Sequence, residues 1–122
     1  MHVDRRSAIR APCDLAAEWR RRPRSLTARV RDLTCDGLFL GLPAVVPLGQ
    51  IMDLVVALPT GPVELLGVSR FCGRTRMGRG IGIAIHAIAP DHRARWDAHY
   101  QVALEEMLRR MPDPVQRILR RR

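Results

Sequence analysis

The sequence predicts an all-β domain, an antiparallel barrel or sandwich of six short strands, that ends in a single helix. Short apolar runs are separated by turns rich in glycine and proline up to about residue 89. Beyond that point the apolar residues recur every three to four positions, which is the helical period. With 122 residues, of which 47% are hydrophobic, the chain is long enough for one folded core.

The six expected strands are apolar segments bounded by turn residues: 13–19, 25–33, 38–42, 51–58, 63–71 and 80–88. The alternation is cleanest in the second strand, where Leu26, Ala28 and Val30 share one face and polar residues share the other. Pro59-Thr60-Gly61-Pro62 is a strong turn, so the fourth and fifth strands are expected to form a hairpin. Residues 74–79 are expected to be a basic loop before the last strand.

The two ends of the chain are expected to lie outside the barrel. Pro90-Asp91 opens the helix, and Trp96 and Tyr100 are its expected core anchors. Pro112-Asp113-Pro114 ends the helix and leaves a basic tail of low expected order. The chain therefore divides into a basic N-terminal arm, a barrel with its helix, and a tail: 1–12, 13–111 and 112–122.

The charge of the chain predicts an anionic partner. The net charge is +9, and all 21 basic residues are arginine, which binds phosphate through a planar fork and stacks on base rings. Composition leaves open whether the partner is a nucleic acid, a nucleotide, an anionic membrane or an acidic protein. No apolar run reaches the roughly eighteen residues of a membrane span, and the N-terminus lacks the apolar segment of a signal peptide. We therefore expect a cytoplasmic protein.

The cysteines and the polar residues give no sign of catalysis. Cys13, Cys35 and Cys72 are odd in number and widely spaced, so we expect reduced thiols that act as small apolar fillers. No His/Cys cluster has metal-ligand spacing, and no paired carboxylates, nucleophile–base arrangement or glycine-rich phosphate loop is present. The sequence predicts neither a metal, a cofactor nor an enzyme.

Two short segments carry the candidate binding chemistry. Arg5, Arg6 and Arg10 form a cluster in the arm, and Asp32-Leu33-Thr34-Cys35-Asp36-Gly37 follows about twenty residues later, at the end of the second strand. Guanidinium groups suit phosphates, and a carboxylate and a hydroxyl suit a base edge. Gly37 is a natural position for positive φ and allows close approach. Together these residues predict an anion or nucleotide site.

Both segments resemble the signatures of the PilZ domain family. Arg6-Ser7-Ala8-Ile9-Arg10 has the R-x-x-x-R spacing of that family, and Asp32 to Gly37 is similar to its D/N-x-S-x-x-G motif, with Thr34 in the serine position. Gly82-Ile83-Ala84-Ile85 is similar to the family's G-[VI]-x-F pattern, with isoleucine where phenylalanine is usual. The resemblance runs from about Arg5 to the helix near Leu108, which is most of the chain.

The resemblance implies a six-stranded antiparallel β-barrel with a C-terminal helix and the function of a bacterial receptor for cyclic di-GMP. By the same resemblance, Arg6 and Arg10 would pair with phosphate oxygens and with the O6/N7 edge of guanine. Asp32 would accept hydrogen bonds from guanine N–H groups, Thr34 would offer its hydroxyl, and Gly37 would keep the turn clear of a side chain. A basic residue at Arg5 is associated in this family with binding a stacked pair of ligands.

The expected mechanism is a disorder-to-order switch. Cyclic di-GMP would fix the charged arm on the barrel and create a surface for a separate downstream protein, with the chain itself a monomer or weak dimer. One alternative is a basic module that binds nucleic acid through its arginine-rich loops and tail, although aromatic residues make up only 4% of the chain. Another is an adaptor of the same family that no longer binds the ligand. The arm can also be a solvated basic segment, and residues 32–37 an ordinary hairpin turn.

Overall fold

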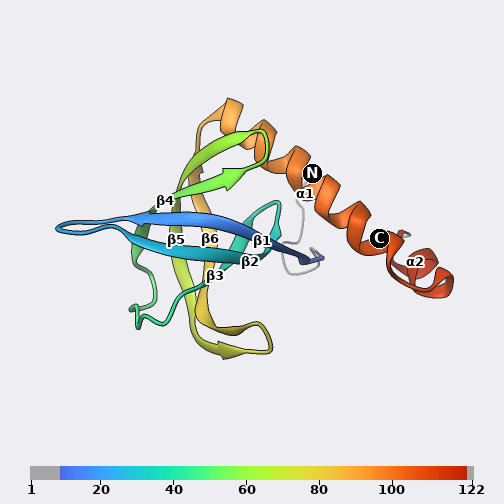
Figure 1. The fold of residues 1–122 in the computed structure, drawn as a ribbon, viewed down its shortest axis with the longest axis horizontal. Coiled ribbons are helices and arrows are strands. Elements are labelled where there is room, and N and C mark those ends of the chain that lie inside the picture. Colours follow the sequence, from blue (N-terminus) through green and yellow to red (C-terminus); the bar gives the residue numbers. More distant parts are fainter. Residues whose placement is uncertain (1–8, 121–122) are drawn as a thin grey trace.

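Six antiparallel strands close into a barrel in the order β1-β2-β3-β6-β5-β4 in the computed structural model, which describes residues 9–120 (Figure 1). The predicted six-stranded barrel with a C-terminal helix is confirmed. The strands are β1 (Ala11–Arg20), β2 (Leu26–Thr34), β3 (Gly37–Gly41), β4 (Ile51–Leu58), β5 (Gly61–Thr75) and β6 (Gly78–Ile88). The pairing of β1 with β4 closes the barrel. Two helices follow, α1 (Pro90–Arg109) and α2 (Asp113–Arg120).

The core is made by the inward-facing residues of all six strands, as the alternation predicted. In β2, for example, Ala28 and Val30 are buried and Thr27 and Arg29 are exposed. The expected hairpin of the fourth and fifth strands is confirmed, because β4 and β5 pair along their length. In the closed order each strand has a neighbouring strand on both sides, so most backbone groups of the barrel find partners within the sheet.

Helix α1 packs against β1 and β5 and covers the core (Figure 1). Pro90 occupies the first turn, where its missing N–H group costs nothing, and Asp91 lies near the positive end of the helix dipole. Trp96 and Tyr100 are buried, so their predicted role as core anchors is confirmed. No helix in residues 9–120 is long and apolar enough to cross a membrane.

The structure corrects the expected order of the C-terminal tail. The tail forms a second helix, α2, because Pro112-Asp113-Pro114 also starts a helix: Asp113 lies in its first turn, and the N–H groups of Val115 and Gln116 donate to the carbonyl of Pro112 at 3.0 and 3.1 Å. Arg120 forms ion pairs with Glu105 of α1 at 3.1 and 3.2 Å. These tertiary contacts were not visible in the sequence.

Most strand boundaries differ from the expectation by one to four residues, and two of the differences affect the candidate site. The first strand begins at Ala11, inside the segment expected to be the arm. The expected basic loop at 74–79 is instead the end of a long hairpin, in which Thr75 pairs with Gly78. The hairpin projects below the barrel in Figure 1, and its exposed, polar sequence hid the strand pattern. This extension matters for the candidate site because it supplies one wall.

Candidate functional site

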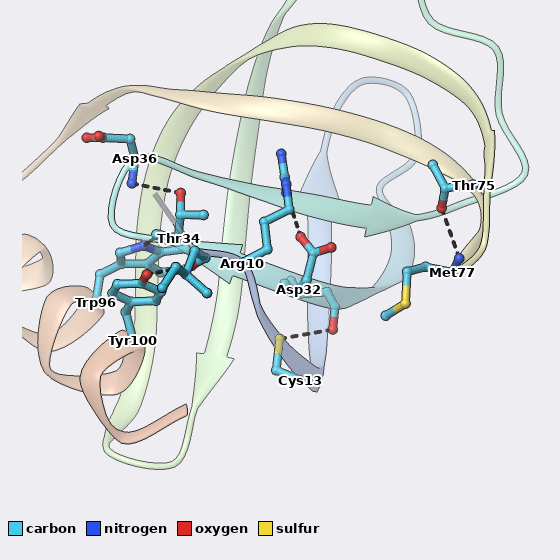
Figure 2. A network of polar contacts seen from close by, with 11 residues as sticks. Arg10, Cys13, Asp32, Thr34, Asp36, Thr75, Met77, Trp96 and Tyr100 are labelled. Carbon is cyan, nitrogen blue, oxygen red and sulfur yellow. Dashed lines mark hydrogen bonds and ion pairs between the residues drawn. The ribbon is translucent and has the colours of Figure 1, made fainter. Parts of the chain in front are cut away.

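The site begins with an ion pair between the arm and the barrel. The Nη1 atom of Arg10 lies 2.6 Å from Oδ1 of Asp32, and Figure 2 shows the two side chains facing each other. Arg10 precedes β1, and Asp32 lies near the end of β2, where it is opposite Pro12 in one neighbouring strand and Phe39 in the other. The Asp32 side chain is 14% exposed and that of Arg10 is 56% exposed. The carboxylate is therefore held by the barrel, whereas the guanidinium reaches it from solvent.

A β-bulge decides that Asp32 faces outward. Strict alternation from Ala28 and Val30 would turn Asp32 into the core, but the pairing of β2 with β3 shifts by one residue between Val30 and Asp32. The extra residue, Arg31, reverses the phase, so that Leu33 is the next fully buried residue and Asp32 points away from the core. The bulge thus turns an otherwise misplaced buried acid into an accessible one.

Arg10 and Asp32 lie at one side of a cavity of about 350 Å³, within the usual size range for small-molecule sites. The opposite wall comes from the hairpin of β5 and β6. The cavity lining combines apolar, hydroxyl and cationic groups: Arg10, Asp32, Phe39, Phe71, Thr75, Arg76, Met77 and Gly82. The structure thus adds a second guanidinium and an aromatic ring to the two polar residues predicted from the sequence.

Phe71 is the most informative residue that the sequence reasoning missed. It is paired with Gly82, and a Cβ atom built on Gly82 or on Gly73 would lie 3.1 Å from Phe71 atoms. The ring therefore lies over backbone that carries no side chain, and yet the residue remains 43% exposed. An accessible, well-supported ring at a cavity can stack on a base. The sequence offered one indication of its importance: the chain has only two phenylalanines, and Phe71 is one of them.

The tip of this hairpin is fixed by its own hydrogen bonds. The hydroxyl of Thr75 accepts from the N–H of Met77 at 3.0 Å and donates to the carbonyl of Gly78 at 3.3 Å, the first of which is drawn in Figure 2. Gly78 has a φ of +98°, a conformation that favours glycine. Arg76 and Met77 are consequently held at the cavity and do not form a loose loop.

Thr34 lies apart from the Arg10–Asp32 cavity. Its side-chain oxygen accepts from the N–H of Asp36 at 3.2 Å, and the residue is buried beneath α1. The hydroxyl proton has no acceptor within residues 9–120, so it can donate one further bond. In this structure, therefore, Thr34 stabilises the turn between β2 and β3.

Gly37 is required for a different reason from the one the sequence suggested. Among residues 9–120, positive φ occurs only at Gly49, Gly61 and Gly78, so the expectation of positive φ at Gly37 was wrong. A Cβ atom at Gly37 would instead lie 2.5 Å from the carbonyl oxygen of Ile83. Glycine is needed here because β3 and β6 approach closely.

Helix α1 holds both halves of the site in place. The indole N–H of Trp96 donates to the carbonyl of Thr34 at 2.9 Å, and Arg93 donates to the carbonyl of Cys35 at 2.5 Å. The hydroxyl of Tyr100 donates to the carbonyl of Ile9, the residue before Arg10 (Figure 2). One helix therefore contacts both the turn after Asp32 and the arm that carries Arg10.

The cysteines near the site are protonated thiols. Burial, together with the negative charges of Asp32 and Asp14, raises the pKa of Cys13 to about 12. Burial and the neighbouring Asp36 carboxylate also raise the pKa of Cys35. All three cysteines are free and partly buried, in agreement with the prediction of reduced fillers.

The structure brings together two of the six predicted site residues, Arg10 and Asp32. Arg5 and Arg6 lie outside the described residues. Thr34 ends β2 and Gly37 begins β3, so the two residues flank the adjoining turn. Within residues 9–120, no group of three or more His, Cys, Asp or Glu side chains is placed to hold a metal ion.

Comparisons with known proteins bear on the fold and the family. The chain resembles the structure of the Bacillus subtilis inhibitor of motility MotI/DgrA, with a TM-score of 0.72, 15% identity, and coverage of 90% of this chain and 55% of that one. It also resembles the PilZ domain of Escherichia coli YcgR with c-di-GMP, with a TM-score of 0.66 and 12% identity; the match covers 85% of this chain and 95% of that one. The PilZ domain of CeSA from a cellulose-synthesizing bacterium matches with a TM-score of 0.56 and 20% identity; the match covers 80% of this chain and 98% of that one.

These identities are low, so the structural matches establish the fold alone. The chain spans little more than half the length of MotI/DgrA but nearly all of the isolated YcgR domain. No curated protein sequence matches the chain significantly. The family model described as "PilZ domain" matches residues 4–100, a range that includes the arginine motif at 6–10 and the aspartate motif at 32–37. This chain belongs to the PilZ domain family.

Proposed function

We propose that this protein is a non-enzymatic receptor for cyclic di-GMP that binds the ligand between Arg10, Asp32 and the hairpin of β5 and β6. The observation that carries the proposal is the pairing of Arg10 with Asp32 at 2.6 Å beside a cavity. Family membership supports it, and so does the structure of the YcgR domain, which was determined with c-di-GMP.

The chemistry of the pair suits a guanine nucleotide. The carboxylate of Asp32 accepts hydrogen bonds, as the N–H donors on the Watson–Crick edge of guanine require. The guanidinium of Arg10 fits either a phosphate or the O6/N7 edge of guanine. A dinucleotide can therefore satisfy both members of the ion pair at once. One guanine base would hydrogen-bond to Asp32, and a phosphate or the second guanine edge would bond to Arg10.

The opposite wall supplies complementary contacts. Phe71 offers a ring for stacking on guanine, and Arg76 offers a second guanidinium for phosphate. Thr34 contributes its hydroxyl proton from the adjoining turn, and Gly37 keeps that turn close to β6. These roles extend the set of site residues beyond the two sequence motifs.

The arm carries the remaining arginines. Arg6 pairs with phosphate or guanine as Arg10 does, and Arg5 stacks on and neutralises a second ligand, so that a stacked pair of cyclic di-GMP molecules binds at each site. Binding fixes the arm on the barrel and presents a composite surface to a separate downstream protein. Tyr100, which already contacts Ile9, anchors the C-terminal end of the arm to α1.

Calorimetric titration with cyclic di-GMP tests this proposal. The wild-type protein should release or absorb heat at tens of micromolar ligand and bind about two molecules per chain. Arg10→Ala should abolish or greatly weaken the signal, whereas Arg109→Ala, which removes the same charge from an exposed position on α1, should leave it unchanged. A silent wild-type titration would overturn the receptor function and leave a family member that acts as an adaptor.

The stoichiometry has its own test. A ratio near one ligand per chain would remove the stacked pair while keeping the receptor. Arg5→Leu should lower a ratio of two to one, because it deletes the guanidinium assigned to the second ligand. If the ratio remains two in that variant, Arg5 does not have this role.

A further inference from the structure

The loop between β3 and β4, residues 42–50, exposes aliphatic side chains to solvent. Val45 is 84% exposed and Leu48 is 68% exposed, and Ile51 at the start of β4 is also exposed. Isolated exposed apolar residues are common on proteins, but these three lie within seven positions of the chain, and Val45 and Ile51 line the same hollow.

This exposure is built into the loop because buried polar groups hold its backbone. The side chain of Ser69, which is fully buried in β5, accepts from the N–H of Gln50 at 2.9 Å and donates to the carbonyl of Pro47 at 2.6 Å. The backbone of Ser69 also accepts from Gly49 at 2.7 Å and donates to Gln50 at 3.0 Å. Four hydrogen bonds to one buried residue fix the loop segment that carries Leu48.

A second β5 residue holds the other half of the loop. The thiol of Cys72 accepts from the N–H of Val46 at 3.4 Å and donates to the carbonyl of Ala44 at 3.6 Å. Val46 is buried, so it anchors the loop while its neighbour Val45 points into solvent. The aliphatic patch is therefore a fixed feature of the surface.

Cations adjoin the patch. The tip of the β1–β2 hairpin carries Arg21, Arg22 and Arg24, and a hollow of about 440 Å³ is lined jointly by Arg21, Arg22, Val45 and Ile51. In Figure 1 the hairpin tip and the loop lie on the same side of the barrel, away from α2.

These three arginines have no acidic partner within the part of the chain that the structure describes, which distinguishes them from their neighbour Arg20. Arg20 pairs with Asp53 at 2.9 Å and with Glu64 at 2.7 Å, so both acids near the hollow already have a cationic partner. Arg21 lies over the ring of Trp19, 4.9 Å from its centroid. The free positive charge is thus concentrated beside the exposed aliphatic residues.

We propose that this surface, formed by Arg21, Arg22, Arg24, Val45, Leu48 and Ile51, binds the surface of an anionic lipid bilayer. Arginines attract phosphate head groups and aliphatic side chains enter the boundary between head groups and acyl chains, which is the combination of signals that peripheral membrane binding needs. The patch lacks the exposed aromatic anchor typical of protein hot spots, and it lacks the stacking platform typical of single-stranded nucleic-acid sites.

The surface is separate from the nucleotide site. Arg10 and Asp32 lie near the start of β1 and the end of β2, whereas the hairpin tip joins the other ends of the same two strands. The strand β1 alone spans about 30 Å at roughly 3.3 Å per residue. Membrane binding therefore leaves the nucleotide site accessible and does not depend on the proposed receptor function.

Vesicle sedimentation of the full chain tests the inference. Sucrose-loaded vesicles of phosphatidylcholine with about 30% phosphatidylglycerol should sediment the protein, and vesicles of phosphatidylcholine alone should not. Replacing Arg21, Arg22 and Arg24 with Gln should lower the partition coefficient by roughly a hundredfold, at about fivefold for each arginine. Val45→Ser with Leu48→Ser should lower it by at least about tenfold without changing the charge.

Matched variants on the helices separate this surface from the net charge of the chain. One control variant removes the same charge by replacing three helix arginines with Gln: Arg109, Arg110 and Arg117. The other control removes comparably exposed aliphatic groups through Val102→Ser and Ile118→Ser. Both controls should reduce binding less than about threefold. Equal losses in the hairpin and helix variants would overturn the proposal, because charge alone would then explain binding. If the wild-type protein does not sediment with anionic vesicles, the proposal is also overturned, and a protein becomes the partner to test for this surface.

Discussion

Arg10 and Asp32 join the arm to the barrel through a contact of 2.6 Å between Nη1 and Oδ1. The two residues belong to different motifs, separated by 22 positions in the sequence, and they meet because β1 and β2 are antiparallel neighbours. A ligand that binds between them must replace or share this ion pair. We therefore expect substitutions at this pair to change ligand affinity more than they change the free energy of unfolding.

Asp32→Asn should weaken cyclic di-GMP binding by about tenfold to a hundredfold. The substitution keeps the shape of the side chain but replaces one acceptor oxygen with an N–H donor that opposes the guanine N–H groups, and a hydrogen bond to a charged group contributes about 1.5–3 kcal/mol. The free energy of unfolding should change by less than about 1 kcal/mol, because Arg10 is largely exposed. Calorimetry and urea unfolding measure the two quantities.

Asp14→Asn is the control for that experiment. Asp14 forms ion pairs with Arg29 and Arg31 on the outer face of β1 and β2, away from the cavity, so the same charge change there should leave ligand affinity unaltered. If Asp32→Asn binds the ligand as tightly as the wild type, Asp32 is not the guanine acceptor.

Phe71→Ala should also reduce affinity, by about fivefold to a hundredfold, since stacking on an aromatic ring contributes about 1–3 kcal/mol per base. Phe71→Tyr keeps the ring and should bind nearly as tightly as the wild type. The protein should remain folded in both variants, because the side chain is partly exposed and lies over glycines, not within the core. Equal affinities of the alanine and tyrosine variants in calorimetric titration would show that the ring does not stack on the ligand.

The barrel was predictable from local patterns because most of its strands bury one face. The alternation in β2 and the proline- and glycine-rich turn between β4 and β5 are properties of neighbouring residues, and both were confirmed. The hairpin end at 74–79 was missed because both of its faces are largely exposed, so no apolar alternation marks it. Helix α2 was missed because its contacts with α1, such as Arg120 with Glu105, are tertiary.

The candidate site was only partly predictable for a similar reason. The motifs identified Arg10 and Asp32, but the bulge at Arg31 that turns the acid outward depends on how β2 and β3 pair. Phe71 reaches the cavity through a second irregularity, between Ser69 and Phe71 in the pairing of β5 with β6. Neither shift of register leaves a signal in a single sequence.

Cys13 should be nearly inert to alkylation in the folded protein. With a pKa of about 12, only about one thiol in ten thousand is a thiolate at pH 8, compared with about one in ten for a cysteine with the ordinary pKa of about 9. Labelling with iodoacetamide, followed by peptide mass spectrometry, should therefore show modification of Cys13 at least a thousandfold slower than in guanidinium-unfolded protein. Comparable rates in the two states would contradict the raised pKa.

The same shift predicts a loss of stability at high pH. The folded protein holds the thiol proton of Cys13 more tightly than the unfolded chain does, so the linked contribution to stability is fully present below the unfolded pKa of about 9. It is lost as the pH rises from there towards 12. Cys13→Ser should flatten this part of the stability curve in denaturant titrations at increasing pH.

Gly37→Ala should destabilise the barrel by about 1–3 kcal/mol, because the new Cβ atom would lie 2.5 Å from the carbonyl oxygen of Ile83 and would force β3 away from β6. Gly41→Ala, on the same strand, is the matched control: its Cβ atom would meet mainly the flexible side chain of Arg31, at 3.1 Å, so its free energy of unfolding should stay within about 1 kcal/mol of the wild type. Urea unfolding of both variants measures the difference. Equal losses would indicate that glycine is needed in β3 for a general reason, whereas a selective loss at Gly37 would show that the motif glycine serves strand packing.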